Sequence, residues 1–507
     1  MFNQINKTMK TFTRLFFFIA AIFMLMACSR TDESDYSLSG LSGGNLMNRP
    51  AVCGNVFIVK PDEDGDDTED LQNAFNDAMD PAKGGGPGSV VQLGEGTYYL
   101  DFMEIREFYG TFSGAGKSKT VITTVADLED DLIISQNLKV VLLKFVGGDV
   151  CMRDMTFMTS PGPLSPGVNR LNGIVHFCSR NAQYNSEKEY INVVVNNVEI
   201  SGHWENTTSG LKVETDFQNT ISGGIPLSHV DISVTNCSFN GVSDYGVLIQ
   251  FVKEGKIVIG TKNNGNIFDN NSWAGLGLWS NVNVDVLVEG NTFINPTGTR
   301  YAIDLNNSPR LPHLESVQQT KVTVYNIEQN EFNLTGGKPK VYEAAIYTED
   351  LRRTRYPEET PALVHVKNNK FNLIDNPYSV FRTFHMSGMV IRNNQLSGNG
   401  QYGVMIRATN SSAYNENGLM LGNNLSNTTF SVASVWLSAL TRNWTMVGGN
   451  LGETIIDDTN GAGNHIITGF NANTSEVPPG QTIVDNLEEM RDALHLNPDN
   501  LLWTVIQ

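Results

Sequence analysis

The chemistry that this chain could perform is concentrated in two short stretches, each carrying a carboxylate. Asp304 lies in "AIDLN" (302–306), where apolar and polar residues alternate, and Glu349 closes "AIYTE" (345–349). Alternation of this kind predicts a strand with one buried face. Two carboxylates on neighbouring strands, about 4.8 Å apart, could act as acid and base in glycoside hydrolysis, which needs carboxyl separations of about 5–5.5 Å or 6.5–9.5 Å.

Positive charge near these carboxylates would suit a different reaction. Elimination on a uronate needs a base and a cation that neutralises the sugar carboxylate, and Arg407 in "GVMIR" (403–407) could supply that charge. A calcium ion among Asp304, Glu349 and Asp350 is an alternative, because calcium prefers oxygen ligands. The spacing does not require a metal, and the candidate catalytic residues are Asp304, Glu349 and Arg407.

Further strands of the same form place aromatic and amide side chains beside the carboxylates. In each strand the second and fourth residues are expected to face inward and the third and fifth outward. "GLKVE" (210–214) would add Lys212 and Glu214, whereas "SVFRT" (379–383) puts Arg382 inward, so its register could slip by one residue. Rings suit the apolar faces of pyranoses and amides suit their hydroxyls, although aromatic stacks also stabilise sheets. The candidate binding residues are Gln250, Trp279, Asn306, Tyr347, Phe381 and Trp436.

A recurring asparagine turn indicates the element that positions these residues. The turn recurs every 25 to 39 residues and is preceded each time by a short β-branched run; taken as equivalent, its residues are Asn197, Asn236, Asn266, Asn291, Asn330, Asn369, Asn394, Asn424 and Asn450. A repeat of this length with strands and no helical period predicts a β-solenoid. The asparagines would stack as a ladder of hydrogen-bonded amides at one corner.

The N-terminal part of the repeat resembles a known family. "DGDDTEDLQNAFNDAM" (64–79), "GSVVQLGEGTYYL" (88–100) and "GTFSGAGKSKTVI" (110–122) are similar to the first coil of right-handed β-helices of the pectate lyase superfamily. The resemblance implies an all-β, right-handed parallel β-helix whose first coil is covered by a helix. At the other end, "DNLEEMRDALHLNP" (485–498) has the capping and spacing of a short C-terminal helix.

The motifs of the well-known members of that superfamily are missing. The fragments "GHW" at 202 and "ETDF" at 214 are not the Gly-His-Gly and Asn-Thr-Asp motifs of polygalacturonase-like hydrolases, and the pectate lyase motifs are absent as well. The resemblance therefore predicts the fold more firmly than the reaction.

The N-terminus has the features of an export signal. A basic segment precedes "LFFFIAAIFMLMA" (15–27), which is too short to span a membrane but suits a signal-peptide core, and Cys28 follows in "LMAC". This resembles the lipobox of bacterial lipoproteins, and "SRTDESD" (29–35) resembles the surface-export signal of Bacteroides-type lipoproteins; an ordinary signal peptide is the alternative. The resemblance implies lipidation at Cys28, the only membrane contact, and a surface position on the cell outer membrane.

These features give an expected organisation: signal peptide 1–27, flexible tether 28–50, β-helix with its N-terminal cap 51–475, and C-terminal helical cap 476–507. The net charge of −19 argues against nucleic-acid binding. The remaining cysteines, Cys53, Cys151, Cys178 and Cys237, form no CxxC pair, so we expect free thiols and no metal site, with a disulfide as the alternative. We expect a monomer.

Two functions of different classes fit this pattern. One is a surface-anchored polysaccharide lyase or glycoside hydrolase that binds and cleaves an extracellular polysaccharide. The other is a glycan-binding or structural β-helix lipoprotein without catalysis. A cleft shared by Asp304, Glu349 and Arg407 would favour the enzyme, whereas an open ridge would favour binding.

Overall fold

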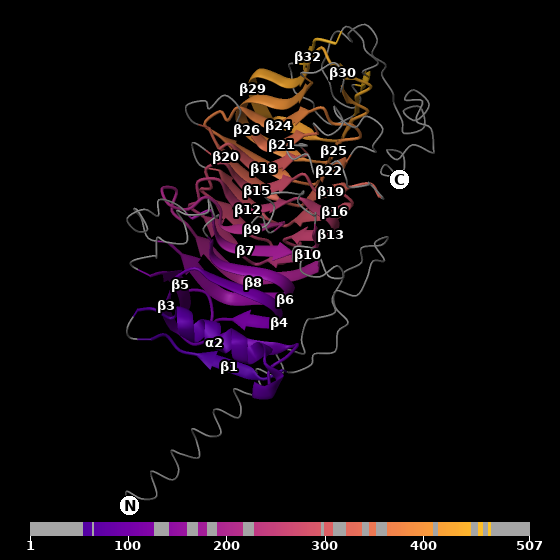
Figure 1. Ribbon diagram of the computed structural model, residues 1–507. Coiled ribbons are helices and arrows are strands. Elements are labelled where there is room, and N and C mark those ends of the chain that lie inside the picture. Colours follow the sequence, from indigo (N-terminus) through magenta and orange to yellow (C-terminus); the bar gives the residue numbers. More distant parts are fainter. Residues whose placement is uncertain are drawn as a thin grey trace, which may run out of the picture.

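The chain forms a right-handed parallel β-helix whose coils stack along one axis, as the computed structural model shows (Figure 1). All pairings between its strands are parallel, so each coil hydrogen-bonds to the coil before and after it. The structure describes residues 54–62, 65–125, 141–159, 171–179, 190–215, 228–295, 299–307, 321–336, 344–350, 362–408, 414–447, 455–459 and 465–467.

The strands of successive coils pair to form three stacks, which are the three parallel sheets of the β-helix. The stack that carries the candidate residues, here called the site stack, contains parts of β4 (Met103–Ser113), β6 (Val141–Met158), β26 (Gln395–Arg407) and β29 (Asn424–Leu437), and also β7 (Gly173–Ser179), β9 (Leu211–Thr215), β12 (Tyr245–Gln250), β15 (Ala274–Trp279), β18 (Tyr301–Asn306), β21 (Ala344–Glu349), β24 (Ser379–Phe384) and β32 (Ile455–Asp457).

The second stack runs through β1 (Val56–Val59), β2 (Ser89–Leu93), β8 (Tyr190–Ser201), β10 (Ser228–Thr235), β13 (Val252–Ile259), β16 (Val284–Glu289), β19 (Val324–Glu328), β22 (Leu363–Lys367), β25 (Val390–Arg392), β28 (Leu419–Leu421), β31 (Thr445–Val447) and β33 (His465–Ile467). The third contains β3 (Gly96–Leu100), β5 (Thr120–Thr124), β11 (Ser238–Asn240), β14 (Ile267–Asp269), β17 (Thr292–Asn295), β20 (Glu331–Thr335) and β23 (Lys370–Ile374). The short strands β27 (Asn415–Glu416) and β30 (Thr441–Arg442) pair separately.

The core lies inside the coils because strand residues alternate between the two faces. On β18, Ile303 and Leu305 are fully buried, as the sequence predicted. Phenylalanines of the third stack form a continuous row, in which Phe293 stacks on Phe332 at 4.9 Å and Phe332 on Phe371 at 4.6 Å between ring centroids. Such rows join each coil to its neighbours through apolar contact.

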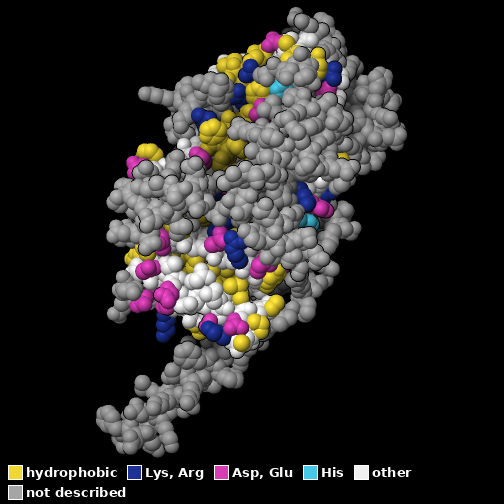
Figure 2. All heavy atoms as spheres, viewed as in Figure 1, with side chains coloured by type: hydrophobic (Ala, Val, Ile, Leu, Met, Phe, Trp, Pro, Cys, Tyr) yellow, Lys and Arg dark blue, Asp and Glu magenta, His cyan; other side chains and the backbone are white. Residues whose placement is uncertain are grey.

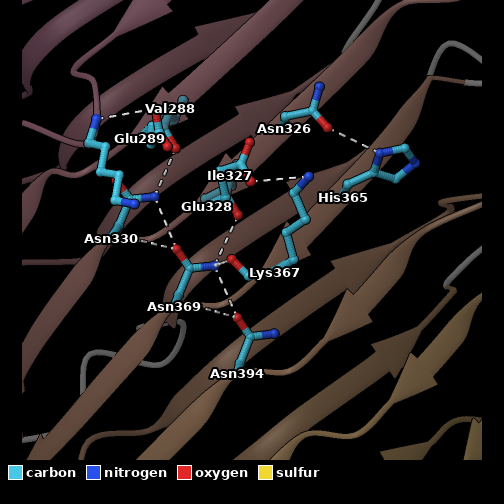
Figure 3. A network of polar contacts seen from close by, with 11 residues as sticks. Val288, Glu289, Asn326, Ile327, Glu328, Asn330, His365, Lys367, Asn369 and Asn394 are labelled. Atoms are coloured by element: carbon cyan, nitrogen blue, oxygen red, sulfur yellow. Dashed lines mark hydrogen bonds and ion pairs between the residues drawn. The ribbon is translucent and has the colours of Figure 1, made fainter. Parts of the chain in front are cut away.

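An asparagine ladder closes one corner, and Figure 3 shows its central part. The Asn330 side-chain amide donates to Val288 O (2.9 Å) and to Asn369 Oδ1 (3.0 Å), while Asn369 donates in turn to Asn394 Oδ1 (3.0 Å). Each Oδ1 also accepts the backbone N–H of the ladder residue on the preceding coil. The predicted ladder is therefore confirmed over these coils.

Its ends differ from the prediction by one residue. The ladder runs from the Cys237 backbone N–H through Asn266 to Asn423, whereas the prediction placed Asn236 and Asn424 at these two corners. The reason lies in the turn, whose first residue takes a left-handed conformation (Asn236 φ 55°, Gly422 φ 63°) while the second points inward. Asn197, at φ 54°, likewise occupies the outer position, and Asn450 lies outside the described residues.

Replacing Asn330 by alanine is expected to destabilise the β-helix by about 3 kcal/mol or more. The change removes the Asn330 amide from the buried Val288 carbonyl and the Asn330 oxygen from the backbone N–H of Asn291, and each buried unsatisfied group costs about 1–3 kcal/mol. Urea unfolding of the variant measures the loss. Asn263→Ala, at an exposed turn, is the control and should change stability by less than about 0.5 kcal/mol; equal losses in both variants would contradict a role for the ladder.

The N-terminal end is covered by α2 (Thr68–Met79), as predicted. Its buried face inserts Phe75 against the rings of Phe108 (5.0 Å) and Phe112 (5.2 Å). Asp67 precedes the helix and accepts the backbone N–H of Tyr99 at 2.7 Å, which ties the helix start to the first coil. No helix within the described residues is long and apolar enough to cross a membrane.

The C-terminal helix, the signal peptide, the tether and the lipidation residue Cys28 lie outside the described residues, as does Cys53. The three other cysteines are free thiols, of which Cys178 and Cys237 are buried and Cys151 is partly exposed. The boundaries of the four predicted regions stay a prediction.

Candidate active site

The outward residues of the site stack form two columns along the β-helix. Strand register aligns one column as Lys144, His176, Lys212, Leu248, Gly277, Asp304, Tyr347, Arg382, Met405 and Trp436. The other contains Cys178, Glu214, Gln250, Trp279, Asn306, Glu349, Phe384 and Arg407. Asp304 and Glu349 therefore lie on neighbouring coils, as the sequence predicted.

The prediction that Phe381 faces outward was wrong. Phe381 pairs with the inward residue Ile346, is 1% exposed and packs edge-on against Phe371 at 5.0 Å. β24 is a six-residue strand that starts one position earlier in register than the alignment assumed, so Arg382 and Phe384 face outward instead. A shift by one residue exchanges the two faces of a strand.

The Asp304 carboxylate is buried among aromatic side chains. It is 2% exposed, and its Oδ2 accepts three hydrogen bonds, from Tyr245 Oη (2.9 Å), Trp273 Nε1 (3.0 Å) and Trp279 Nε1 (3.2 Å). Asp304 thus faces outward, as predicted, but its carboxylate is shielded from solvent. The cause is the row of rings around it, since Tyr245 meets Trp279 edge-on at 5.6 Å and Trp273 lies 6.3 Å from Tyr301.

The other oxygen of the same carboxylate has no hydrogen-bond partner. Oδ1 of Asp304 and Oδ1 of Asn306, two residues further along β18, are both buried acceptors without a donor in the described structure. Glu349 pairs in register with Asn306, and its Oε2 accepts the Tyr347 hydroxyl at 2.9 Å. Because buried acceptors are normally satisfied, two bare oxygens on one strand face mark a place where a ligand could donate hydrogen bonds.

Burial raises the pKa of Asp304 to about 6, although the three donors act in the opposite direction. The negative charge of Glu349 raises it further. A carboxyl group with this pKa changes its protonation state close to neutral pH, which is what general acid or base catalysis requires. Perturbed carboxyls of this kind cluster at functional sites.

The raised pKa also predicts how stability depends on pH. Because the folded pKa of Asp304 lies above the unfolded value of about 3.9, its ionisation costs stability as pH rises from about 4 through about 6, by roughly 3 kcal/mol in total. Asp304→Asn removes this titration. Urea unfolding should therefore show the variant gaining roughly this amount relative to wild type between about pH 4 and pH 8, and a pH-independent difference would contradict the assignment.

A second polar cluster lies on the same columns, towards the N-terminal end of the site stack. Lys212 Nζ donates to Asn172 Oδ1 and to Glu214 Oε1, both at 3.0 Å. The Gln250 amide donates to Glu214, whose Oε1 lies 3.7 Å from His176 Nε2. Glu214 is 2% and Lys212 3% exposed, so two opposite charges are buried as a pair. Burial of a charge is tolerated when it is paired in this way.

The remaining predicted residues lie further from Asp304. Gln250 belongs to the Lys212–Glu214 cluster, and Trp436 lies four coils from Asp304 in its own column. Arg407 lies three coils away, about 14 Å along the axis. Arg407 therefore does not adjoin the two carboxylates, and a catalytic role for it stays a prediction. Arg382, two coils from Asp304, is the nearer cation.

The calcium hypothesis finds no support within the described residues. No group of three or more histidine, cysteine, aspartate or glutamate side chains there is placed to hold a metal ion. Asp350 is 1% exposed and accepts from the buried Asn307 amide at 3.1 Å, whereas Asp304 and Glu349 lie in the outward columns. Asp350 is thus engaged with Asn307, apart from the two carboxylates of the outward columns.

Sequence reasoning missed Tyr245, Trp273, Tyr301, His176 and Lys144. The first residue of each six-residue strand also faces the site, since Tyr245, Ala274, Tyr301 and Ala344 pair in register and pack together. The signal available in the sequence is an aromatic residue at the first position of the strand, in "DYGVLIQ" and "RYAIDLN".

The fold defines the protein as a right-handed parallel β-helix. Residues 58–295 match the family described as rhamnogalacturonase A/epimerase, pectate lyase-like. The match includes the Lys212–Glu214 cluster and ends before Asp304. No curated protein matches the chain.

Solved structures of the same fold resemble the chain only distantly. They include the Azotobacter vinelandii mannuronan C-5 epimerase AlgE6 A-module (12% identity, covering 83% of this chain and 96% of that one, TM-score 0.40) and the Streptococcus pneumoniae surface adhesin PfbA (14%, 72% and 89%, 0.38). The catalytic unit of a GH87 alpha-1,3-glucanase from Streptomyces thermodiastaticus is a third (14%, 82% and 69%, 0.38). At these scores the likenesses carry no argument about function.

Proposed function

We propose that the protein binds a polysaccharide along the outward face of the site stack and cleaves it at Asp304. The observation that carries this proposal is the difference in hydrogen bonding between the two oxygens of the Asp304 carboxylate. One oxygen is held by three donors, while the other is a bare acceptor among aromatic rings. Such a group is positioned by the protein and left with one oxygen for a substrate.

The surroundings of Asp304 suit a sugar chain. Tyr301 and Tyr347 stack at 4.8 Å between centroids, and Trp279 is partly exposed beside the carboxylate. Rings of this kind pack against the apolar faces of pyranoses, and Asn306 offers an acceptor to a hydroxyl. The straight, repeated face of a solenoid accommodates an extended polymer. The matched family description, rhamnogalacturonase A/epimerase, also names carbohydrate-active proteins.

The geometry is compatible with two ways of breaking a glycosidic bond. In hydrolysis, Asp304 and Glu349 on adjacent coils act as the two carboxylates, and the raised pKa of Asp304 suits the acid. In elimination, Asp304 Oδ1 accepts the proton from the sugar carbon and the leaving oxygen takes a proton from a second group. The two reactions differ in their products, since only elimination leaves an unsaturated sugar.

The test is a screen of residues 29–507 against neutral, uronate and sulfated polysaccharides. Ultraviolet absorbance detects unsaturated products, and a reducing-end assay detects hydrolysis. Turnover that disappears in Asp304→Asn is the expected result. Turnover that survives in this variant would move the chemistry elsewhere, with Glu214 and His176 as the next groups to substitute.

A non-catalytic glycan-binding role is the second candidate, favoured by the 2% exposure of Asp304. In that case the carboxylate orders Tyr245, Trp273 and Trp279 as a platform for the polymer. Retention of one polymer without any turnover, weakened in Tyr347→Ala, would support this role over catalysis.

We also propose that the mature chain is anchored in the outer membrane by a lipid on Cys28 and faces outward. The proposal rests on the sequence "LMAC" and the acidic segment that follows it. Mass spectrometry of the N-terminal peptide tests lipidation, and protease treatment of intact cells tests exposure. Cys28→Ser should release the protein from the membrane fraction, and unchanged fractionation would argue against the anchor.

A further inference from the structure

Arg407 is held between two aromatic rings on the outward face of the site stack. Its guanidinium carbon lies 5.5 Å from the ring centroid of Phe384 and 5.1 Å from that of Trp436. Trp436 is itself fixed, because its indole N–H donates to Asp458 Oδ2 at 2.8 Å and its ring stacks on Tyr402 at 5.7 Å. Two aromatic rings therefore lie within cation–π distance of the guanidinium.

No carboxylate in the described part of the chain forms an ion pair with Arg407. Other arginines there do have such partners, as Arg106 pairs with Glu104 and Arg442 with Glu416. The difference is unexpected in a chain with 54 acidic and 35 basic residues. Because Arg407 has no carboxylate partner in the described part of the chain, a bound ligand could supply the negative charge beside it.

The chemistry of arginine favours an oxyanion as that ligand. A guanidinium presents a planar fork of N–H donors, from which a carboxylate or sulfate can accept two parallel hydrogen bonds, and it also packs well beside aromatic rings. Lysine cannot reproduce this planar fork. Figure 2 shows Lys and Arg side chains beside hydrophobic ones on the upper coils of this face, above the labels β21 and β24 of Figure 1.

The distance from Asp304 separates this contact from the bond that would be cleaved. Arg407 lies three coils, about 14 Å, from Asp304. At that distance its side chain cannot touch the sugar residue whose bond Asp304 would cleave. We propose that Arg407 binds a carboxylate or sulfate group on a sugar further along the polymer, so that it selects an anionic polysaccharide without taking part in the reaction. This inference rests on the proposed function and names the substrate class.

Arg407→Met and Arg407→Lys test the inference. The probes are a polyuronate and a sulfated polysaccharide, each paired with its carboxyl-reduced or desulfated form; the member that binds identifies the anionic group. For the anionic polymer we expect Arg407→Met to raise Kd, and KM where turnover is seen, by about ten- to a hundredfold with little change in kcat. Arg407→Lys should restore only part of the loss, and the neutral form should bind both proteins equally weakly.

Arg442→Met is the matched control, because Arg442 also lies over a ring, that of Tyr414 at 4.0 Å, but outside the site stack. It should leave Kd unchanged. Equal binding of the anionic polymer by wild type and Arg407→Met would overturn the inference and leave the proposed function standing, as would binding of neutral polymers alone. A wild-type protein that binds none of the polymers would overturn both.

Discussion

Asp304→Asn is expected to lower turnover of the polymer by about a hundredfold to ten-thousandfold, the usual contribution of a positioned acid or base. The amide oxygen can still accept from Tyr245, Trp273 and Trp279, so the surrounding rings keep their places. The amide cannot, however, exchange a proton at the Oδ1 position. Initial rates on the polymer found in the screen measure the effect, with circular dichroism to show that the fold is intact.

The pH profile of the wild type gives a second measurement of the same group. If Asp304 acts as the base, kcat/KM should rise with pH and level off above about 6, whereas an acid role would make it fall above that pH. Asp231→Asn is the matched control, since Asp231 also accepts a tyrosine hydroxyl, from Tyr190 at 3.1 Å, but lies on β10. A rate lost equally in both variants would contradict the assignment to Asp304.

Lys212→Met is expected to destabilise the protein by about 3–5 kcal/mol at neutral pH. Methionine retains the length of the side chain but removes the positive charge that Lys212 places beside the buried Glu214 carboxylate. The loss of this charge matters only while the Glu214 carboxylate is ionised, so part of the loss should disappear as the solution is acidified. Urea unfolding at several pH values measures both effects.

The double variant Lys212→Met/Glu214→Gln separates the charge from the packing. Replacing both partners is often nearly neutral, because no uncompensated charge remains. Lys119→Met, which breaks the exposed pair with Glu95, should cost less than about 1 kcal/mol. A double variant as unstable as Lys212→Met would show that packing and not charge sets the cost.

The sequence was sufficient for the fold because the repeat is local. Each asparagine turn marks one corner of the β-helix within a few residues of sequence. The alternation in "AIDLN" and "GLGLW" also assigns the inward face of each strand correctly. Register was less secure. Phe381 and Arg382 exchanged faces because the start of β24 depends on its pairing with β21, which no local pattern contains.

The site was predicted in part, for a physical reason. The identity of Asp304 and its neighbour Glu349 followed from strand alternation, but its burial did not. Whether an outward side chain is solvated depends on rings contributed by other coils, here Tyr245 and Trp273. The Lys212–Glu214 pair was hidden for the same reason, since Gln250 and His176 reach it from adjacent strands.

The asparagine ladder has a consequence for how such a protein can change. Successive ladder residues are separated by 25, 29 or 39 positions, yet each makes the same contacts. The rise of each coil, about 4.8 Å, is therefore independent of the number of residues in it. Insertions in a coil therefore change the loops beside the site stack but leave the distance from Asp304 to Arg407 unchanged. Selection can thus vary what surrounds a bound polymer while the spacing of its contacts is conserved by the backbone.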